Sequence, residues 1–352
     1  MKLTRSVRAW LLGLASMHAV VACAGFFAPY DPIEQDREHP YAPPVRIHLR
    51  DTRGEFHWHP FVYALRPLEG AFDRYEENTA EMIPLQFFVT GAHYHLLGLV
   101  PCRVHLFGAK EGRVAVLGTD GYGRDQFSRL LWGGQISLLA GLLATALSLA
   151  CGLMIGAAAG YWGGWTDEAL MRGAELFLAL PWLYLLFAVR AFLPLTVSPL
   201  DAFLLVISVI GLVGWARPAR LVRGVVLTAK ERDYVRAARG FGAGNAYIVR
   251  RHILPETASV LLTQAALLAP QYVLAEVTLT FLGLGVPEPA PSWGNLLAVL
   301  QEYSVLTSYW WMWLPALAMT PFFLGYLGLA GALQRWADPS KMEAAGSGRQ
   351  TR

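Results

Sequence analysis

The stretch Ile136–Tyr161, ISLLAGLLATALSLACGLMIGAAAGY, contains no charged residue and decides the fold class of this chain. Its length exceeds the roughly 20 apolar helical residues that are needed to cross a bilayer core. Inside hydrocarbon, only helices and closed barrels satisfy their own backbone polar groups, and a continuous apolar run without alternation is typical of a helix. The sequence therefore predicts a membrane protein built from helices.

Five other apolar runs predict five further membrane helices. They are Val7–Ala28, Leu170–Leu195, Leu200–Trp215, Thr257–Leu284 and Trp310–Leu333. The composition agrees, because 55% of the residues are hydrophobic and 16% are charged, whereas about a quarter of the residues in soluble domains are charged. We expect an all-α polytopic membrane protein with six transmembrane helices.

The run Ile136–Tyr161, which is the second span in chain order, carries glycine at every fourth position, at Gly152, Gly156 and Gly160. This spacing places small residues on one face of the helix, where a neighbouring helix can approach closely. We expect ordinary packing within a helix bundle at this face rather than a special dimer contact.

Basic residues predict the orientation of the spans, because short cytoplasmic loops carry an excess of lysine and arginine. Such residues precede the first span, recur through the segment 217–256 and occur again in the tail. The N-terminus, this segment and the C-terminus are therefore predicted to lie in the cytoplasm. The expected parts are a cytoplasmic N-terminus with the first helix (1–29), an extracytoplasmic insertion (30–115), a transmembrane core (116–340) and a cytoplasmic tail (341–352).

The insertion contains short apolar and aromatic runs, such as Phe61–Tyr63 and Leu85–Val89, which predict a small β-rich domain. It also contains two histidine pairs, His57 with His59 and His93 with His95. Residues i and i+2 share one face of a strand, so each pair could supply two metal ligands. Surface histidines explain the same pattern, and we expect no metal site.

A basic segment, Asp233–Pro255, separates the fourth and fifth spans and reads DYVRAARGFGAGNAYIVRRHILP. Four of its apolar residues recur with helical spacing: Tyr234, Ala237, Ala238 and Phe241. Glycines at 240, 242 and 244 predict a turn, and a second short helix is expected over 246–253. Two short helices joined by glycines outside the membrane predict a compact knob that enters a groove on a cytosolic partner.

This segment resembles the cytoplasmic coupling loop of ABC importer permeases, specifically the C-type permease of the dipeptide, oligopeptide and nickel branch. The residues in the register of that loop are Ala237, Ala238, Gly242, Leu254 and Pro255. Two positions depart from it, since Arg236 stands where the family usually has glutamate and His252 where it usually has isoleucine.

Further blocks resemble the same branch, in the same order and at the same spacings. One precedes the second span and another follows the fifth span; they include Gly123, Arg124, Asp125, Ser292, Trp293 and Gly294. Tyr161–Trp165 and Asp338–Pro339 also match. The resemblance covers residues 5–30 and 115–340, and it leaves out residues 35–112 of the insertion.

The resemblance implies a five-helix type I permease core preceded by one N-terminal helix, in a bacterial inner membrane. It implies as partners a second related permease subunit, cytoplasmic ATPase subunits and an extracytoplasmic solute-binding protein. It also implies that the following residues couple the chain to the ATPase: Asp233, Tyr234, Arg236, Ala237, Ala238, Phe241, Gly242, Leu254 and Pro255. The implied solute is a peptide or a related small molecule.

The chain contains no glycine-rich phosphate loop followed by lysine and a hydroxyl residue, which is the sequence that binds nucleotide phosphates in ATPases. We therefore expect a transport subunit that is not an enzyme and holds no cofactor. ATP and Mg²⁺ are expected in the partner ATPase.

Polar residues inside the spans are candidates for the translocation pathway, because ionisable groups in hydrocarbon are costly. Gln271 and Glu276 lie in the fifth span. They either line a pathway for a polar solute or, in the case of Glu276, are satisfied by hydrogen bonds between helices. Arg190 lies near the outer end of the third span, and we expect its side chain to reach the surface.

Two other functions are compatible with parts of the sequence. A permease of the same type could carry a metal complex or a sugar, and no residue separates these solutes from a peptide. A membrane-anchored sensor or assembly protein could use the insertion, but it would not need the segment Asp233–Pro255. We expect the lipid bilayer, and no nucleic acid, as a further partner.

Overall fold

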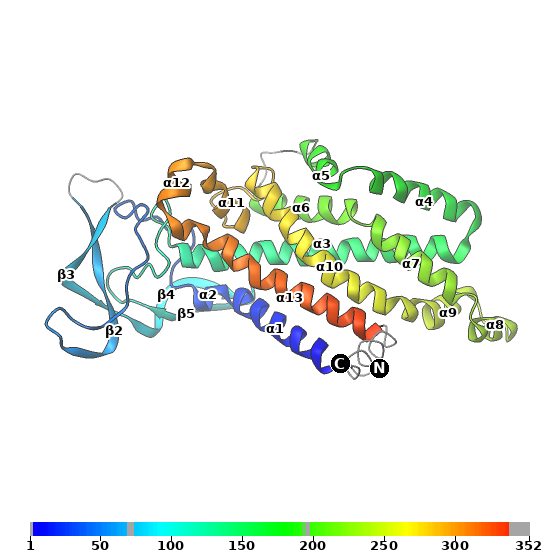
Figure 1. Cartoon of the computed structure of the whole chain (residues 1–352), viewed down its shortest axis with the longest axis horizontal. Helices are drawn as coiled ribbons and strands as arrows, with labels where there is room; N and C mark the ends of the chain where they lie inside the picture. Colours follow the sequence, from blue (N-terminus) through cyan, green and yellow to red (C-terminus); the bar gives the residue numbers. More distant parts are fainter. Residues whose placement is uncertain (1–2, 69–73, 193, 195–197, 338–352) are drawn as a thin grey trace, which may run out of the picture. The chain divides into compact units, whose positions relative to one another are not determined.

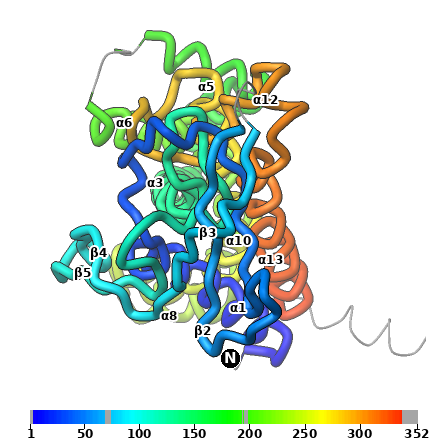
Figure 2. Tube along the Cα trace, turned by 90° about the vertical axis from the view of Figure 1, so that its left-hand side faces the viewer, coloured from blue at the N-terminus to red at the C-terminus, as the bar shows by residue number. Residues whose placement is uncertain are grey.

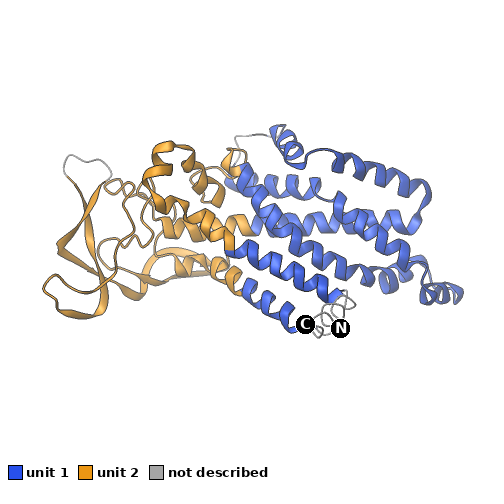
Figure 3. Cartoon of the chain, viewed as in Figure 1, with its two compact units in different colours: residues 1–15, 139–279, 321–352 blue, residues 16–138, 280–320 orange. Residues whose placement is uncertain are grey.

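The structure, a computed structural model, describes residues 3–68, 74–192, 194 and 198–337. The chain forms two compact units, which Figure 3 shows in different colours. Unit 1 contains residues 1–15, 139–279 and 321–352, and unit 2 contains residues 16–138 and 280–320. The expected match at Asp338–Pro339 and the tail 341–352 lie outside the described residues.

The described part of unit 1 consists of helices and their connections (Figure 1). These are the start of α1 (Arg5–Ala22), most of α3 (Gln126–Trp162), α4 (Gly164–Ala179), α5 (Trp182–Ala191), α6 (Pro199–Val213), α7 (Ala216–Ala229), α8 (Asp233–Gly240), α9 (Asn245–Ile248), most of α10 (Ala258–Phe281) and most of α13 (Leu314–Ala337). A π-helical turn, Val249–Ile253, and a 3-10 turn, Leu254–Thr257, join α9 to α10.

Three helical stretches are long and apolar enough to cross a membrane: Gln126–Trp162, Asn245–Phe281 and Trp310–Ala337. Two bent pairs, α4 with α5 and α6 with α7, meet the same criterion when each pair is taken together, with bends of 94° and 43°. The described residues therefore hold three to five candidate spans, which confirms the expected helical membrane protein. The expected first span, α1, is not among the candidates, so the count of six stays a prediction.

Proline explains the sharper of the two bends. Leu180 precedes Pro181 and has extended backbone, with φ −84° and ψ 141°, because proline disfavours the helical conformation at the residue before it. The gentler bend falls at Gly214 and Trp215, and Pro218 then lies in the first turn of α7, where a proline is tolerated.

The glycines of α3 lie against α7, as their four-residue spacing predicts. A Cβ atom added to Gly152 would lie 2.6 Å from Cβ of Pro218. At Gly156 the added atom would meet the backbone oxygen of Ala219, and Gly160 is similarly crowded. The two helices therefore approach more closely than larger side chains would allow, and the predicted close packing is confirmed.

Unit 2 contains two small antiparallel sheets together with short helices. One sheet has the order β1–β2–β3, with strands His48–Arg50, Phe56–Pro67 and Tyr75–Pro84. The other is a hairpin of β4 (Gln86–Leu96) and β5 (Val100–Gly108), which Figure 2 shows to the left of β2 and β3. The helices are α2 (Ala24–Phe27), α11 (Trp293–Ala298) and α12 (Tyr303–Ser308), together with 3-10 turns at Val299–Gln301 and Trp310–Trp313.

The first sheet has a small apolar core, in which Val62, Ile83, Leu85 and Val114 are buried. The two runs that were expected to form strands, Phe61–Tyr63 and Leu85–Val89, lie in β2 and mostly in β4. The strands therefore occupy the region that the sequence marks as an insertion between the first two expected spans.

Candidate functional site

The segment Asp233–Pro255, called the knob below, folds within unit 1 as two short helices joined by glycines. Its first helix, α8, begins at Asp233 and has Arg239 in its last turn, so both charges are favourable in the dipole of the helix. The chain then reverses at Gly242, whose φ of +82° suits glycine and strains other residues. The predicted arrangement of helix, glycine turn and second helix is confirmed, with α9 and a π turn in place of one longer second helix.

One side of the knob is anchored in a buried apolar cluster. Its core consists of Val235, Ile248 and Ile253 from the knob and Val222, Val226 and Ala229 from α7. In addition, the hydroxyl of Tyr161, at the end of α3, donates a hydrogen bond of 2.8 Å to the side chain of Asn245. The sequence reasoning missed Val235 as the anchor, because a helix of eight residues is too short to show a second apolar face.

The other side of the knob is exposed and carries the predicted contact residues. Tyr234 is 40% exposed and Phe241 is 92% exposed. Ala237 is also exposed, while Ala238 is half-buried. Exposed aromatic side chains on a small, well-anchored surface are typical of contacts with another protein, so this face is available to a partner.

The two residues that differ from the resembled loop, Arg236 and His252, each lie close to particular side chains. The guanidinium of Arg236 lies 3.2 Å from the carboxylate of Glu231, and both side chains are exposed. The ring centroid of His252 lies 5.7 Å from those of Tyr234 and Tyr247. The knob therefore carries an aromatic cluster where the resembled loop has an aliphatic residue.

The exit from the knob is the 3-10 turn that begins at Leu254 and Pro255. Pro255 is in the first turn, where its missing N–H group leaves no hydrogen bond unmade. Tyr234 donates a hydrogen bond of 3.1 Å to the carboxylate of Glu256, which ties the contact helix to this exit. Partial burial and the adjacent Glu256 raise the pKa of the Tyr234 hydroxyl.

The two predicted pathway residues have different surroundings in unit 1. Gln271 lines a cavity of about 120 Å³ together with aromatic residues and one arginine, chiefly Trp182, Tyr272 and Arg217. Glu276 is fully buried and does not line this cavity.

Arg190 is also buried, and its guanidinium donates a hydrogen bond of 2.9 Å to the carbonyl oxygen of Pro194. The expectation that Arg190 reaches the surface is therefore wrong.

In unit 2, the predicted block Gly123–Asp125 contributes to a charge network around two buried arginines at the start of α3, in which Glu288 is exposed. The guanidinium of Arg124 lies 2.7 Å from the carboxylates of both Asp120 and Glu288. Arg129 lies 2.8 Å from Glu288 and 3.4 Å from Asp120. Buried arginines need such partners. The sequence did not indicate Glu288 as a partner, because it lies more than 150 residues further along the chain.

The second predicted block, Ser292–Gly294, packs against the same part of α3. Ser292 and Asn295 form a capping box that starts α11. The indole N–H of Trp293 donates to the carbonyl oxygen of Leu130 at 3.0 Å, and its backbone N–H donates to Ser137 at 3.1 Å. The two blocks, remote in sequence, therefore meet at the start of α3.

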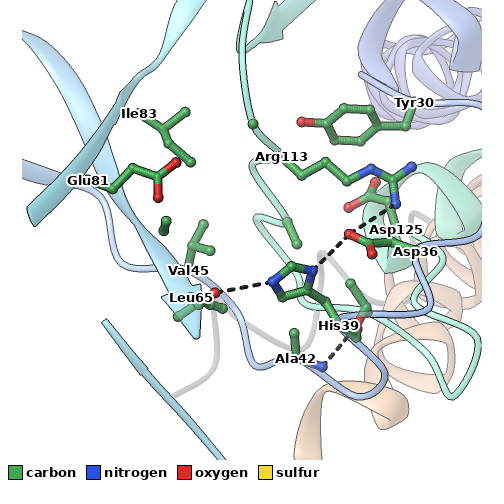
Figure 4. Close-up of a pocket in the computed structure, with 14 residues that line it drawn as sticks. Tyr30, Asp36, His39, Ala42, Val45, Leu65, Glu81, Ile83, Arg113 and Asp125 are labelled. Atoms are coloured by element: carbon green, nitrogen blue, oxygen red, sulfur yellow. Dashed lines mark hydrogen bonds and ion pairs between the residues drawn. The ribbon is translucent and has the colours of Figure 1, made fainter. Parts of the chain in front are cut away.

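Unit 2 also holds a cavity of about 200 Å³ that is lined by residues of the insertion together with Thr119 and Asp125 (Figure 4). Asp36 accepts a hydrogen bond of 2.9 Å from His39, and the guanidinium of Arg113 lies beside the ring of Tyr30. Burial raises the pKa of Tyr30 to about 12 and that of Asp125 to about 6. The cavity therefore combines a largely apolar lining with a few ionisable groups, and the charge of Asp125 within it depends on pH.

The histidine pairs of the insertion have separate surroundings. His57 lies 3.2 Å from Asp51, and with Glu55 these form a group whose potential ligand atoms are all within 4.8 Å of one another. His59 is not part of that group, and His93 accepts a hydrogen bond from Arg103 at 3.1 Å. Exposed acidic groups of this kind are common without a metal ion, and the expected absence of a metal site stays a prediction.

Comparison with known proteins gives relatives of one kind. A putative peptide permease protein of Brucella suis biovar 1 is 37% identical over 214 residues, which cover 60% of this chain and 69% of the relative. The dipeptide transport system permease protein DppC of Bacillus subtilis is 36% identical over 224 residues, covering 63% of this chain and 68% of DppC.

Among solved structures, an amino acid ABC transporter crystallised with histidines is similar with a TM-score of 0.43 and 17% identity, over 59% of this chain and 92% of that chain. The family described as binding-protein-dependent transport system inner membrane component matches residues 152–339, which is more than half of the chain. The chain therefore belongs to this family of inner membrane transport components.

Proposed function

We propose that the chain is the permease subunit of an ATP-driven importer for peptides, with the knob as its contact to a cytoplasmic ATPase. The observation that carries the contact is the knob itself, which exposes Tyr234 and Phe241 while Val235 anchors it. The curated relatives named above support a peptide as the solute, because their names describe peptide and dipeptide permeases.

The anchoring of the knob suggests how motion of an ATPase would reach the helices of unit 1. The buried cluster joins the knob to α7, and the Tyr161–Asn245 hydrogen bond joins it to the end of α3. Asp167 of α4 and Arg223 of α7 form a bidentate ion pair. A movement of the knob would therefore carry α7, and α7 would carry α4.

We also propose an orientation for the chain in the membrane and a set of partners. The N-terminus, the knob and the C-terminus lie in the cytoplasm, in agreement with their excess of basic residues. A second related permease completes the pathway, and a solute-binding protein delivers the solute from the opposite side. ATP and Mg²⁺ bind in the ATPase, where the hydrolysis occurs.

The turn of the knob offers the sharpest test. Gly242→Val places a β-branched residue at φ +82°, which is strongly unfavourable, although no atom lies within 4 Å of the new Cβ position. We expect this variant to insert in the membrane and to lose most of its solute uptake, with ATP hydrolysis no longer stimulated by loaded binding protein. Uptake and ATPase activity would be measured with the assembled importer in vesicles.

Gly240→Val is the matched control, because Gly240 ends α8 without a positive φ and also has no atom within 4 Å of its Cβ position. It is expected to retain most of the uptake. Normal uptake by Gly242→Val would contradict the proposed contact, while uptake of sugars in preference to peptides by the unmodified importer would contradict the proposed solute alone.

A further inference from the structure

The tip of the β4–β5 hairpin in unit 2 presents an unusual surface. Residues Leu96–Pro101, with the sequence LLGLVP, contain no polar side chain. Leu97 is 59% exposed and Leu99 is 81% exposed, and Val100 is exposed as well. A run of exposed apolar residues is unfavourable in water and indicates a surface that another apolar phase covers.

The contacts of the hairpin show in which direction this tip points. Gly91 of β4 lies beside Pro29, and Tyr94 packs on Gly25 so closely that a Cβ atom at Gly25 would overlap the ring of Tyr94. His105 of β5 also contacts Gly25, because its Nδ1 lies 2.8 Å from the carbonyl oxygen of that residue. β4 therefore runs antiparallel to the segment 25–29, back towards α1.

The tip lies three residues beyond Tyr94, which is roughly 10 Å further along a strand at about 3.3 Å per residue. Gly98, at the tip, lines a cavity of about 480 Å³ together with Trp132 and Gln135 of α3. Gln135 in turn donates a hydrogen bond of 3.2 Å to the carbonyl oxygen of Ala22, the last residue of α1. The tip, the end of α1 and the third turn of α3 therefore lie at one level within unit 2.

That level is the place where the apolar part of α3 begins. α3 is a candidate membrane span, and the apolar run that the sequence predicts as a span, Ile136–Tyr161, starts directly after Gln135. A side chain at this level meets the boundary between lipid headgroups and acyl chains. An apolar loop there gains the same stabilisation as the apolar face of an interfacial helix.

We propose that the tip, Leu96–Pro101, inserts into the bilayer interface beside the end of α1 and the start of α3 and anchors the hairpin to lipid. The residues just behind the tip fit this environment, because His93 and Arg103, 3.1 Å apart, lie on the strands where headgroup phosphates would be. The inference needs α3 to cross the membrane, and it does not depend on the solute or on the ATPase.

The test uses the full chain in nanodiscs of phosphatidylethanolamine and phosphatidylglycerol, with Cys23, Cys102 and Cys151 each changed to serine. Leu99→Cys carries an environment-sensitive fluorophore. We expect blue-shifted emission, strong quenching by lipids with a nitroxide near the headgroup, and protection from iodide in the solvent. The fluorophore replaces an exposed side chain, so folding does not depend on it.

Trp58→Cys is the matched control, because Trp58 is an exposed apolar side chain of β2, 88% exposed, in the other sheet. Its label is expected to be quenched by iodide and not by the nitroxide lipids. The inference is overturned if the label at 99 is as accessible to iodide as the label at 58. It is also overturned if the label at 99 is protected without nitroxide quenching, since protein would then cover the tip.

Discussion

At the scale of single residues, Asp125 links the stability of unit 2 to pH. Its side chain is 2% exposed, and one carboxylate oxygen accepts a hydrogen bond of 2.7 Å from the backbone N–H of Ser128 in the first turn of α3. Burial is the main cause that raises its pKa from 3.8 to about 6. The folded protein therefore holds this proton more tightly than the unfolded chain does.

The sign of the effect on stability follows from this difference. Between about pH 4 and pH 6 the folded state binds more protons, so the free energy of unfolding falls as the pH rises. Above pH 6 the buried carboxylate is ionised at a cost of about 3 kcal/mol, from 1.36 kcal/mol for each pKa unit. The stabilisation of the folded state by the protonated carboxyl of Asp125 is fully present below pH 4 and is lost as the pH rises through 6.

Asp125→Asn should remove this pH dependence and keep the hydrogen bond to Ser128, because asparagine also accepts from the first turn of a helix. We expect the midpoint of thermal unfolding in detergent to be higher than that of the unmodified protein at pH 7.5 and nearly constant from pH 4 to 7. Asp125→Ala, which also loses the hydrogen bond, should be less stable than the asparagine variant at every pH. An unchanged pH profile in Asp125→Asn would contradict this account.

Residue-scale sequence reasoning succeeded for local features and failed for long-range ones. Tyr234 and Phe241 were expected on an exposed face from helical spacing alone, and their exposure agrees with it. Arg190 is buried against expectation, and Glu288 pairs with two arginines that lie far from it in sequence. Hydropathy describes the average surroundings of a segment, so it does not contain such pairings.

At the scale of elements, the contact between α3 and α7 depends on glycine. Gly156→Ala should destabilise the protein by about 1 to 3 kcal/mol, because the new methyl group would meet the backbone of Ala219, which moves only if α7 moves. Gly224→Ala, on α7 with no atom within 4 Å of its Cβ position, should be neutral or stabilising by up to about 1 kcal/mol. Thermal unfolding in detergent compares the two, and equal midpoints would contradict the close approach.

The elements themselves were predicted unevenly. The apolar runs located the long helices, but the run Leu170–Leu195 is divided by a bend of 94° at Pro181. The segment 217–256 was expected as a loop from its arginines, whereas residues 216–229 form helix α7. The helical spacing of Ala219, Val222 and Val226 marks the buried face of α7, and the arginines between them obscured it.

At the scale of the whole molecule, the role of Gln271 is testable only in an assembled importer. Gln271 lines the cavity beside Trp182 and Tyr272, and Gln271→Leu keeps its size while removing its hydrogen-bonding groups. We expect the KM for peptide uptake to rise severalfold, with little change in basal ATP hydrolysis.

Gln264→Leu is the control for Gln271→Leu, since Gln264 lies on the same face of α10 two turns earlier and does not line this cavity. If both variants raise KM equally, or if neither does, the cavity is not part of the pathway. Glu276, which is buried away from the cavity, is expected to affect assembly more than KM.

The family motifs are divided between the two units of the molecule. The knob belongs to unit 1, while the blocks Gly123–Asp125 and Ser292–Gly294 belong to unit 2. The resemblance at these blocks was enough to indicate the family. It could not indicate the charge network, the cavity around Asp125 or the hairpin tip, because each of these depends on how remote segments fold together.

The charge network of Asp120, Arg124, Arg129 and Glu288 also has a consequence for the order of synthesis. A ribosome produces both arginines long before Glu288, so a nascent chain holds two positive charges at the start of α3 with Asp120 as the one carboxylate of this network already made. Burial of these arginines is costly until the second carboxylate arrives. The start of α3 should therefore stay solvated, or be held by insertion factors, until the chain beyond the fifth expected span has left the ribosome.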